Sequence, residues 1–229
     1  MKLKKLIVMF FIFLCLNIFS KNEKVKIKNI QFKIGLKKQG LIDIKPLVPS
    51  ILINMKYSTK DNFLKKDAYG NFNKCFLQKT AAKKLIRAQK ILKRINPKLT
   101  LLVYDCLRPR RVQHQMWKIV KGTPRQRYVA NPYRGSIHNY GCAVDLTIAA
   151  QNGIPLDMGT PFDFFGKRAQ PRYERYFFKK GKLTRKHLKN RRLLRYVMKK
   201  AGFIGIRSEW WHYNAFSNAY VKKRYKIVE

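Results

Sequence analysis

Acidic residues, histidines and cysteines are all scarce in this sequence of 229 residues. It has 11 Asp and Glu against 52 Lys and Arg, which gives a formal net charge of +41, and it has only four His and four Cys. No apolar run reaches the roughly 18 residues that indicate a membrane-spanning helix, and no internal period indicates a repeat protein. At 46% apolar residues, the chain is too hydrophobic for a disordered basic tail. We therefore expect one compact and very basic domain.

The N-terminus has a different character from the rest of the chain. Three lysines among the first five residues precede an unbroken apolar run over residues 6–16, and the small residue Ser20 follows. This layout is typical of a secretory signal peptide, and the run is short for a membrane span. We interpret residues 1–20 as a cleaved signal and residues 21–229 as a domain exported to the periplasm or cell envelope, without a membrane span after cleavage. An uncleaved, membrane-anchoring N-terminus is the alternative.

Three cysteines follow the predicted signal, so at most one disulfide can form among them. They are Cys75, Cys106 and Cys142. In an exported protein a Cys106–Cys142 bridge is one alternative, and three small buried side chains are the other. No two cysteines have the close spacing of a structural zinc site.

Positive charge is spread along almost the whole chain. It is densest over residues 179–200, which contain eleven Lys and Arg and no acid. We interpret this stretch as a solvated loop followed by the polar face of a helix. Because a field of this sign attracts any polyanion whatever the fold, we expect non-specific association with anionic polymers of the envelope. The even spread of the charge argues against a dedicated nucleic-acid site.

Apolar periodicity predicts helices and strands in an irregular order. The predicted helices cover residues 80–94, 109–120 and 191–201. The predicted strands cover residues 99–104, 142–148 and 206–212, after an N-terminal arm (21–56) with one or two more. We expect residues 151–190 to form an excursion outside the core. Because strands and helices do not alternate regularly, we predict an α+β fold, a single compact domain with a small, mostly antiparallel sheet and flanking helices.

Two segments bring histidines and acids close together in the sequence. Residues 136–145 contain His138 and Asp145, and residues 209–212 contain Glu209 and His212. Two imidazoles and one carboxylate form an open, three-ligand zinc set, and the remaining carboxylate could act as a general base. The alternative is that His138 is a turn residue and His212 is a hydrogen-bonded core histidine. Trp210 and Trp211 would then be ordinary core residues.

Side-chain direction sets a condition on such a site. In a regular strand, positions 209 and 212 point to opposite faces, and so do positions 138 and 145. The two members of each pair can therefore share a site only if the strand is interrupted between them. Gly141 can interrupt the first segment. The second needs a bulge or a strand end near Trp210 and Trp211.

These two segments, with three others, resemble a known family. The other three cover residues 57–63, 104–109 and 158–163. Together the five resemble, in order and from about residue 41 to 216, the zinc D-alanyl-D-alanine dipeptidases of the vancomycin-resistance type. The related D,D-carboxypeptidases tend to have proline before the final Trp-His pair, where this chain has Trp210.

The resemblance implies one zinc ion per chain, bound at the sheet by His138, Asp145 and His212. It also implies that Glu209 is the proton-shuttling base and that Arg108 hydrogen-bonds the oxygen that becomes negative during hydrolysis. A planar donor that is always charged suits that role. The alternative for Arg108 is an ordinary surface arginine.

The resemblance further implies how a substrate is held. Ser136 would bind the substrate carboxylate, while Tyr57 and Asp163 would hold its free amino group. His114 and His187 have no matching place, and we interpret both as surface or helix residues.

We therefore predict a zinc metallopeptidase that hydrolyses D-alanyl-D-alanine to two D-alanines in cell-wall peptide turnover or recycling. One alternative is a D,D- or L,D-carboxypeptidase that trims peptidoglycan stem peptides. The other is a non-catalytic cationic protein that binds wall polymers on the same scaffold.

Overall fold

A computed structural model describes residues 32, 34–70 and 72–229 of the chain. It divides into two compact units, residues 1–40 and residues 41–229. The described part of the first unit is helical over residues 34–38. The predicted signal peptide, and the part of the N-terminal arm that precedes residue 32, lie outside the described residues.

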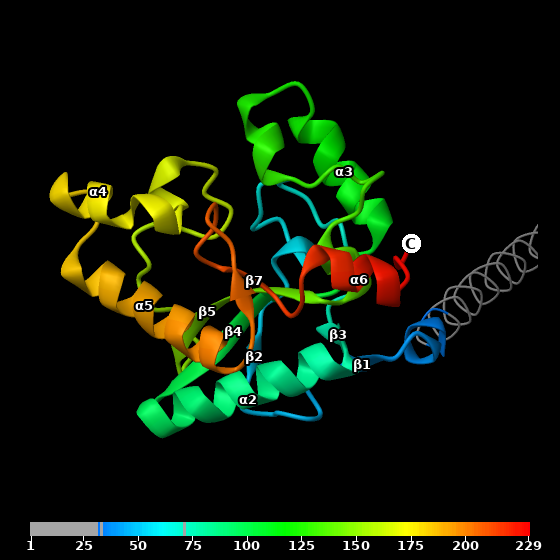
Figure 1. The fold of residues 1–229 in the computed structure, drawn as a ribbon, viewed down its shortest axis with the longest axis horizontal. Coiled ribbons are helices and arrows are strands. Elements are labelled where there is room, and N and C mark those ends of the chain that lie inside the picture. Colours follow the sequence, from blue (N-terminus) through cyan, green and yellow to red (C-terminus); the bar gives the residue numbers. More distant parts are fainter. Residues whose placement is uncertain (1–31, 33, 71) are drawn as a thin grey trace, which may run out of the picture. The chain divides into compact units, whose positions relative to one another are not determined.

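The second unit is organised around a five-stranded sheet (Figure 1). Its strand order is β2-β4-β5-β7-β6, where β2 and β4 are parallel and every other pair is antiparallel. The five strands are β2 (Leu52–Ile53), β4 (Leu99–Asp105), β5 (Ala143–Ala150), β6 (Ile204–Gly205) and β7 (His212–Asn214). A separate antiparallel pair consists of β1 (Leu41–Asp43) and β3 (Phe76–Gln78).

Two long helices pack against one face of this sheet, as Figure 1 shows. They are α2 (Lys79–Ile95) and α5 (Arg185–Lys200). Each buries an apolar stripe, which in α2 contains Ala81, Leu85, Ala88 and Leu92 at spacings of three and four. The shorter helices are α3 (Arg110–Val120), α4 (Glu174–Lys179), α6 (Asn218–Arg224) and the 3₁₀ turns η1 (Lys56–Ser58), η2 (Pro124–Tyr128), η3 (Ile137–Tyr140), η4 (Lys167–Ala169) and η5 (Pro171–Tyr173).

The predicted α+β class, with a mostly antiparallel sheet and flanking helices, is confirmed. The first two predicted helices and the two central strands appear within two residues of their expected bounds. The third helix starts six residues before its predicted start, at Arg185. Thr184 caps it, because its hydroxyl accepts from the His187 amide while the His187 ring accepts from the Thr184 amide.

The predicted strand over residues 206–212 is wrong. The structure instead has the short strands β6 and β7, joined by a bent segment that contains Glu209. Trp210 and Trp211 in this segment are almost completely buried. Their size and apolar character were typical of a strand, but they fill the core from irregular backbone.

The expectation that residues 151–190 lie outside the core is also wrong in part. Met158, Ala169 and Leu183 are buried, and the Thr160 hydroxyl accepts a hydrogen bond from the Trp210 indole at 2.8 Å. The segment is therefore attached to the core and carries Asp163 to the site described below.

The disulfide joins Cys75 to Cys106 rather than Cys106 to Cys142. Among the described cysteines, Cys142 stays free and is buried beside Tyr140 and Val221. The Cys75–Cys106 bridge links the entry of β3 to the exit of β4, two segments whose adjacency the sequence does not reveal.

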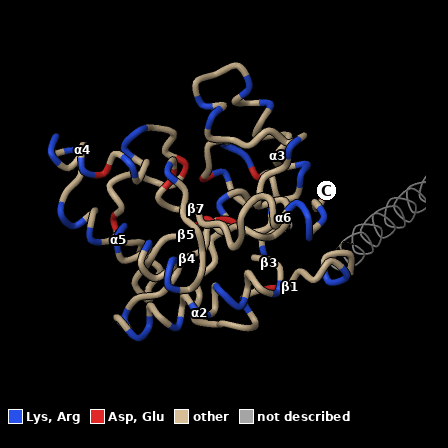
Figure 2. The backbone as a smooth tube through the Cα atoms, viewed as in Figure 1, with Lys and Arg blue, Asp and Glu red and all other residues tan. Residues whose placement is uncertain are grey.

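Lys and Arg positions are spread along the described backbone, as the coloured tube in Figure 2 shows. None of the helices in the described part of the chain combines the length and the hydropathy needed to cross a bilayer.

Candidate active site

Asp145 and His212 face each other across two neighbouring strands. They are direct partners in the antiparallel pairing of β5 with β7, so their side chains lie on the same face of the sheet. Val144 and Leu146, which flank Asp145, point into the core that contains α2 and α5. The site therefore lies on the face of the sheet opposite these two helices.

His138 reaches the same place from the 3₁₀ turn η3. Ser136 and Asn139 form a reciprocal capping box around this turn. Gly141 then directs the chain into β5 with a left-handed φ of 66°, and a Cβ at this position would lie 2.3 Å from the Leu41 side chain. Only glycine therefore fits here without rearrangement, and the predicted break at Gly141 is confirmed.

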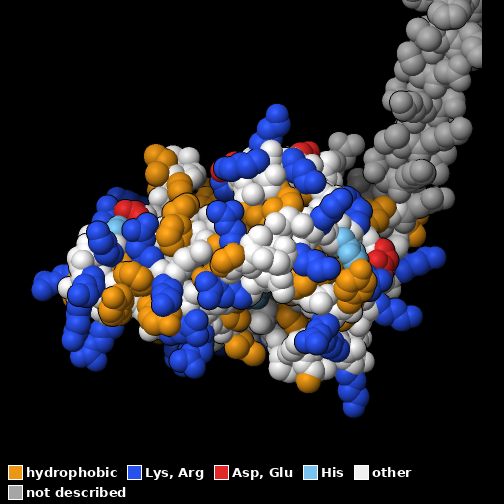
Figure 3. All heavy atoms as spheres, turned by 90° about the horizontal axis from the view of Figure 1, so that it is seen from above, with side chains coloured by type: hydrophobic (Ala, Val, Ile, Leu, Met, Phe, Trp, Pro, Cys, Tyr) orange, Lys and Arg blue, Asp and Glu red, His pale blue; other side chains and the backbone are white. Residues whose placement is uncertain are grey.

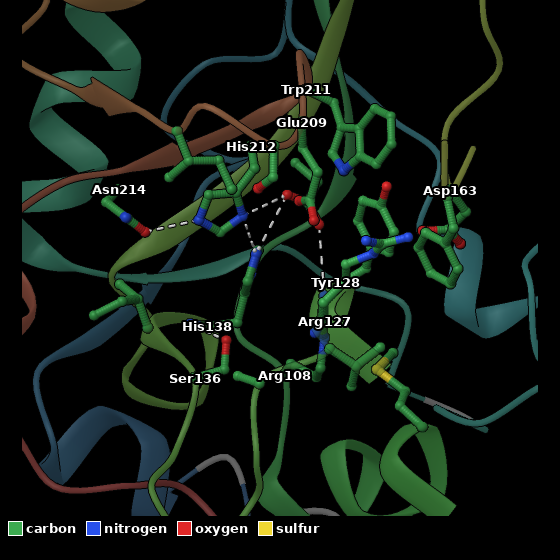
Figure 4. Close-up of a pocket in the computed structure, with 18 of the residues that line it drawn as sticks. Arg108, Arg127, Tyr128, Ser136, His138, Asp163, Glu209, Trp211, His212 and Asn214 are labelled. Atoms are coloured by element: carbon green, nitrogen blue, oxygen red, sulfur yellow. Dashed lines mark hydrogen bonds and ion pairs between the residues drawn. The ribbon is translucent and has the colours of Figure 1, made fainter. Parts of the chain in front are cut away.

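Three potential ligand atoms converge at the centre of the site (Figure 4). His212 Nδ1 lies 2.9 Å from Asp145 Oδ1, and His138 Nε2 lies 3.3 Å from the same oxygen. The two imidazole nitrogens are 3.1 Å apart. Burial opposes ionisation of Asp145, but His138 and His212 hold the pKa of its carboxyl well below its usual range.

The outer nitrogen of each ring has its own acceptor. His138 Nδ1 donates to the Cys106 carbonyl at 2.7 Å, and His212 Nε2 donates to Asn214 Oδ1 at 2.8 Å. In the neutral form of each ring these bonds place the proton on the outer nitrogen, so the nitrogen that faces Asp145 can bind a cation, which is how histidine ligands are commonly oriented. The donor set of two neutral imidazoles and one carboxylate therefore fits a divalent cation such as zinc.

Glu209 lies in the bend before β7, so a strand end rather than a bulge separates it from His212. Burial raises the pKa of the Glu209 carboxyl to about 8; the charges of Asp145 and Asp163 add to this shift and His212 opposes it. A carboxyl that titrates close to neutral pH can both accept and return a proton.

Arg108 is 8% exposed, so its interpretation as an ordinary surface arginine is wrong. Its Nε and one terminal nitrogen donate to Asp105 Oδ2 at 2.9 and 2.6 Å, and the other terminal nitrogen donates to Gln113 at 3.0 Å. The nitrogen on Asp105 also lies 3.5 Å from Asp145 Oδ2. The guanidinium is thus fixed beside the three converging ligand atoms.

A bulge in β4 explains how Asp105 reaches Arg108. Val103 pairs with Leu146, but Asp105 pairs with Asp145, so two steps along β4 match one step along β5. The extra residue, Tyr104, turns Asp105 onto the same face as Asp145. The buried carboxylate of Asp105 also accepts a hydrogen bond from the Tyr69 hydroxyl.

Tyr57 and Asp163 form a second polar group in the same cavity. The Tyr57 hydroxyl lies 3.0 and 3.1 Å from the two Asp163 oxygens, and the Phe63 amide donates to Asp163 at 3.4 Å. Asp163 has a left-handed φ of 59°, an unusual conformation for a residue other than glycine. Burial raises the pKa of Asp163 to about 7, although the Tyr57 hydrogen bond acts in the opposite direction.

One cavity of about 300 Å³ connects these groups. Apolar walls include Phe63, Tyr128, Phe165 and Trp211, and Tyr128 stacks on Phe165 with ring centroids 5.2 Å apart. All eight residues singled out in the sequence line this cavity. They are Tyr57, Arg108, Ser136, His138, Asp145, Asp163, Glu209 and His212.

Sequence reasoning missed three residues that orient this site, namely Asp105, Gln113 and Asn214. Asp105 stands in the segment 104–109 that carries the family resemblance, but no role was predicted for it. Asn214 follows His212 by two residues, so in a strand it shares the same face. Gln113 shows no signal in the sequence, because its contact depends on how α3 packs.

Comparison with known proteins identifies the family of this chain. The profile of the family described as D-ala-D-ala dipeptidase matches residues 37–229. The chain is 33% identical over 173 residues to the D-alanyl-D-alanine dipeptidase of Escherichia coli, covering 76% of this chain and 83% of that protein. Proteins of the same name from Synechocystis and Enterococcus faecalis are 30% identical over 162 residues and 26% identical over 198 residues. The Synechocystis match covers 58% of this chain and 66% of that protein. The Enterococcus faecalis match covers 79% of this chain and 94% of that protein.

A family match over most of the chain thus accompanies a His-Asp-His set and two further acids in one cavity, and the chain belongs to the D-alanyl-D-alanine dipeptidase family.

Proposed function

We propose that the protein hydrolyses D-alanyl-D-alanine to two D-alanines with the help of one bound zinc ion. The names of its relatives support this substrate. The observation that carries the proposal is the single cavity that holds the His-Asp-His set, Glu209, Arg108 and the Tyr57–Asp163 pair.

His138, Asp145 and His212 would hold the zinc ion. When bound, zinc polarises a carbonyl oxygen and lowers the pKa of water. The carbonyl of Cys106 and the amide of Asn214 keep the two rings in the tautomers that ligation requires.

Glu209 is the general base. It accepts a proton from the attacking water as the water oxygen bonds to the peptide carbon. It returns that proton to the leaving nitrogen when the carbon–nitrogen bond breaks. The pKa of about 8 that burial gives the Glu209 carboxyl suits this two-way transfer.

Arg108 stabilises the negative charge that develops on the former carbonyl oxygen. Asp105 and Gln113 hold three of its nitrogens in fixed positions, so little reorganisation is needed when the charge appears. Arg108 also lies over the Tyr57 ring, with its central carbon 5.3 Å from the ring centroid.

Asp163 and Tyr57 determine the length of the substrate. An ionised Asp163 pairs with the free ammonium of a dipeptide, whereas a longer peptide presents a neutral amide at that position. The longer substrate would leave a buried carboxylate without its partner. Ser136, at the entrance to η3, binds the carboxylate at the other end of the dipeptide.

We also propose that the protein is exported, with residues 1–20 as the signal peptide and residues 21–229 as the catalytic domain. The Cys75–Cys106 disulfide supports an oxidising compartment such as the periplasm or cell envelope. There the enzyme would act in turnover or recycling of cell-wall peptides.

The test compares three substrates with purified protein, with and without a chelator. They are D-alanyl-D-alanine, its N-acetyl form and a stem pentapeptide. We expect kcat/KM for the free dipeptide to exceed the other two values at least ~100-fold and to fall when zinc is removed. Equal cleavage of the N-acetyl form would replace the dipeptidase by a carboxypeptidase, and no hydrolysis of any substrate would indicate a non-catalytic protein.

A further inference from the structure

The segment from residue 167 to residue 192 carries unusually dense positive charge. It contains twelve Lys and Arg and one acid, Glu174. The Glu174 carboxylate already binds Arg195 at 2.8 Å and lies 3.7 Å from Arg191. The other basic side chains of the segment therefore gain little neutralisation from this acid.

Helix α5 presents part of this charge as one exposed row. It buries Leu188 and Leu194, and this leaves Arg185, Lys189 and Arg192 exposed at spacings of four and three. Like charges at these spacings repel and destabilise a helix. An anionic partner would relieve that repulsion.

An aromatic side chain accompanies the row of charges. In the neighbouring helix α4, Phe178 is 36% exposed, while the more exposed Tyr176 stands two residues earlier and so on a different side of the helix. Phe178 contributes to a surface hollow of about 790 Å³ between α4 and α5. The basic residues around this hollow are Arg172, Arg175, Arg185, Lys189 and Arg192. We call these five, with Phe178, the α4–α5 surface.

The α4–α5 surface is separate from the candidate active site. None of its six residues lines the active-site cavity. In Figure 1, α4 and the start of α5 lie at the end of the described fold away from α3 and α6. Figure 3 shows basic side chains gathered with apolar ones at that same end.

We propose that the α4–α5 surface docks the protein peripherally on an anionic phospholipid bilayer. Phe178 enters the headgroup region, while the arginine and lysine side chains around it reach the lipid phosphates. Charge alone would suit any polyanion. The exposed Phe178 ring favours a bilayer, because a soluble anionic polymer offers no apolar layer for it to enter.

The test measures sedimentation of the full-length protein with phosphatidylcholine vesicles, with and without phosphatidylglycerol. One variant combines Arg175→Gln, Arg185→Gln, Lys189→Gln and Arg192→Gln. Its control makes the same loss of charge on the exposed side of α2, with Lys83→Gln, Arg87→Gln, Lys90→Gln and Arg94→Gln. Residues 1–20 are present in every protein, so differences between variants report the substituted surface.

Each basic side chain near an anionic membrane contributes roughly fivefold to affinity. We therefore expect the fourfold variant of the α4–α5 surface to lose at least ~50-fold in affinity for phosphatidylglycerol vesicles. The α2 control should lose far less. Equal losses in the two variants would overturn the proposal, because they would indicate an effect of net charge alone. D-alanyl-D-alanine hydrolysis should be unchanged in both variants, which checks that both are folded.

A second pair of variants separates a bilayer from a polymer. Phe178→Ser removes the exposed aromatic ring of the surface, and Ile154→Ser removes an exposed apolar side chain elsewhere. We expect only Phe178→Ser to weaken vesicle binding, with binding to soluble polyphosphate unchanged in both. If Phe178→Ser binds vesicles as tightly as wild type does, the surface is not a lipid-docking site.

Discussion

The two histidines of the candidate metal site offer different nitrogens, Nε2 in His138 and Nδ1 in His212. In each ring the hydrogen bond of the opposite nitrogen explains the choice. The Cys106 carbonyl belongs to the backbone directly after β4, whereas the acceptor for His212 is the side chain of Asn214. The second bond can therefore be removed by substitution without disturbing the strand.

We predict that Asn214→Ala weakens zinc affinity about 10–100-fold, because His212 loses the bond that fixes its tautomer and direction. Asn218→Ala, at another residue that lines the cavity, is the control and should leave the affinity unchanged. Competition with a chromogenic chelator measures both values. His138→Ala and His212→Ala should lose the metal altogether, and an Asn214→Ala protein with wild-type affinity would remove the orienting role.

Glu209 should be needed for proton transfer but not for metal binding. We expect Glu209→Gln to retain about one zinc per chain and to lower kcat by on the order of 10²–10⁴-fold. Metal analysis and steady-state kinetics on the same preparation test both parts. Loss of zinc from this variant would make Glu209 a ligand instead of a base.

Asp163 should make activity depend on pH near neutrality. Burial raises the pKa of its carboxyl to about 7. In the proposed function the ionised form binds the substrate ammonium, so kcat/KM for D-alanyl-D-alanine should fall as pH falls through about 7. Asp163→Asn should be less active on the dipeptide and should lose the part of this fall that belongs to Asp163, while the fall through about pH 8 that protonation of the base Glu209 causes should remain. A pH profile unchanged by the substitution would assign the whole fall to another group.

The raised pKa of Asp163 also affects the stability of the folded protein. The folded-state pKa of Asp163 is higher than its unfolded value, so the folded protein binds more protons between about pH 4 and pH 7. Asp163 therefore reduces the free energy of unfolding as pH rises through this window. Urea unfolding at several pH values should show a smaller decrease for Asp163→Asn than for wild type.

At the scale of elements, the disulfide fastens the two segments that lead into the site. It closes a loop across a sequence separation of 31 residues, and Cys106 lies directly after Asp105. Constraining a loop of this length contributes about 3–4 kcal/mol to stability in the chain-entropy description.

We predict that the pair Cys75→Ala and Cys106→Ala lowers the free energy of unfolding by about 3–4 kcal/mol. Cys142→Ala is the matched control, because it removes a buried thiol that closes no loop, and it should cost about 1 kcal/mol. Denaturant unfolding measures both. Reductant should destabilise wild type and Cys142→Ala but not the double variant; an effect on all three would contradict the assignment.

Elements with a strong local pattern were predictable. Helix α2 repeats apolar residues at helical spacing, and β4 is a continuous apolar run. The start of α5 was missed because its first turns are strongly basic and only the capping pair Thr184 and His187 marks it. The bulge in β4 was not predictable, because its cause is the pairing with β5 and not the local sequence.

At the scale of the whole molecule, the three proposed ligands come from η3, β5 and β7. Zinc bound to all three would hold these elements together and would bind the folded state more tightly than the unfolded state. At a free zinc concentration about 100 times Kd, this linkage adds about 2.7 kcal/mol to stability.

We therefore expect a chelator to lower the melting temperature of the wild-type protein. His138→Ala, which lacks one ligand, should start from a lower melting temperature and respond far less to the chelator. Differential scanning calorimetry with and without the chelator measures both. A wild-type melting temperature that does not change when the metal is removed would contradict coupling between the metal and the fold.

The sequence by itself singled out His138, Asp145, Glu209 and His212, because histidines and acids are scarce in this chain and stand close together in two segments. Gly141 redirects the chain after His138, as its place in the sequence predicted, whereas the bend that separates Glu209 from His212 replaces a predicted strand. Tertiary structure alone decided how these side chains are held. The pairing of Cys75 with Cys106, the burial of Arg108 against Asp105 and the contact of Gln113 all join segments whose adjacency depends on packing. Local sequence sets dihedral angles and periodicity, whereas a contact between distant segments depends on how the whole core closes.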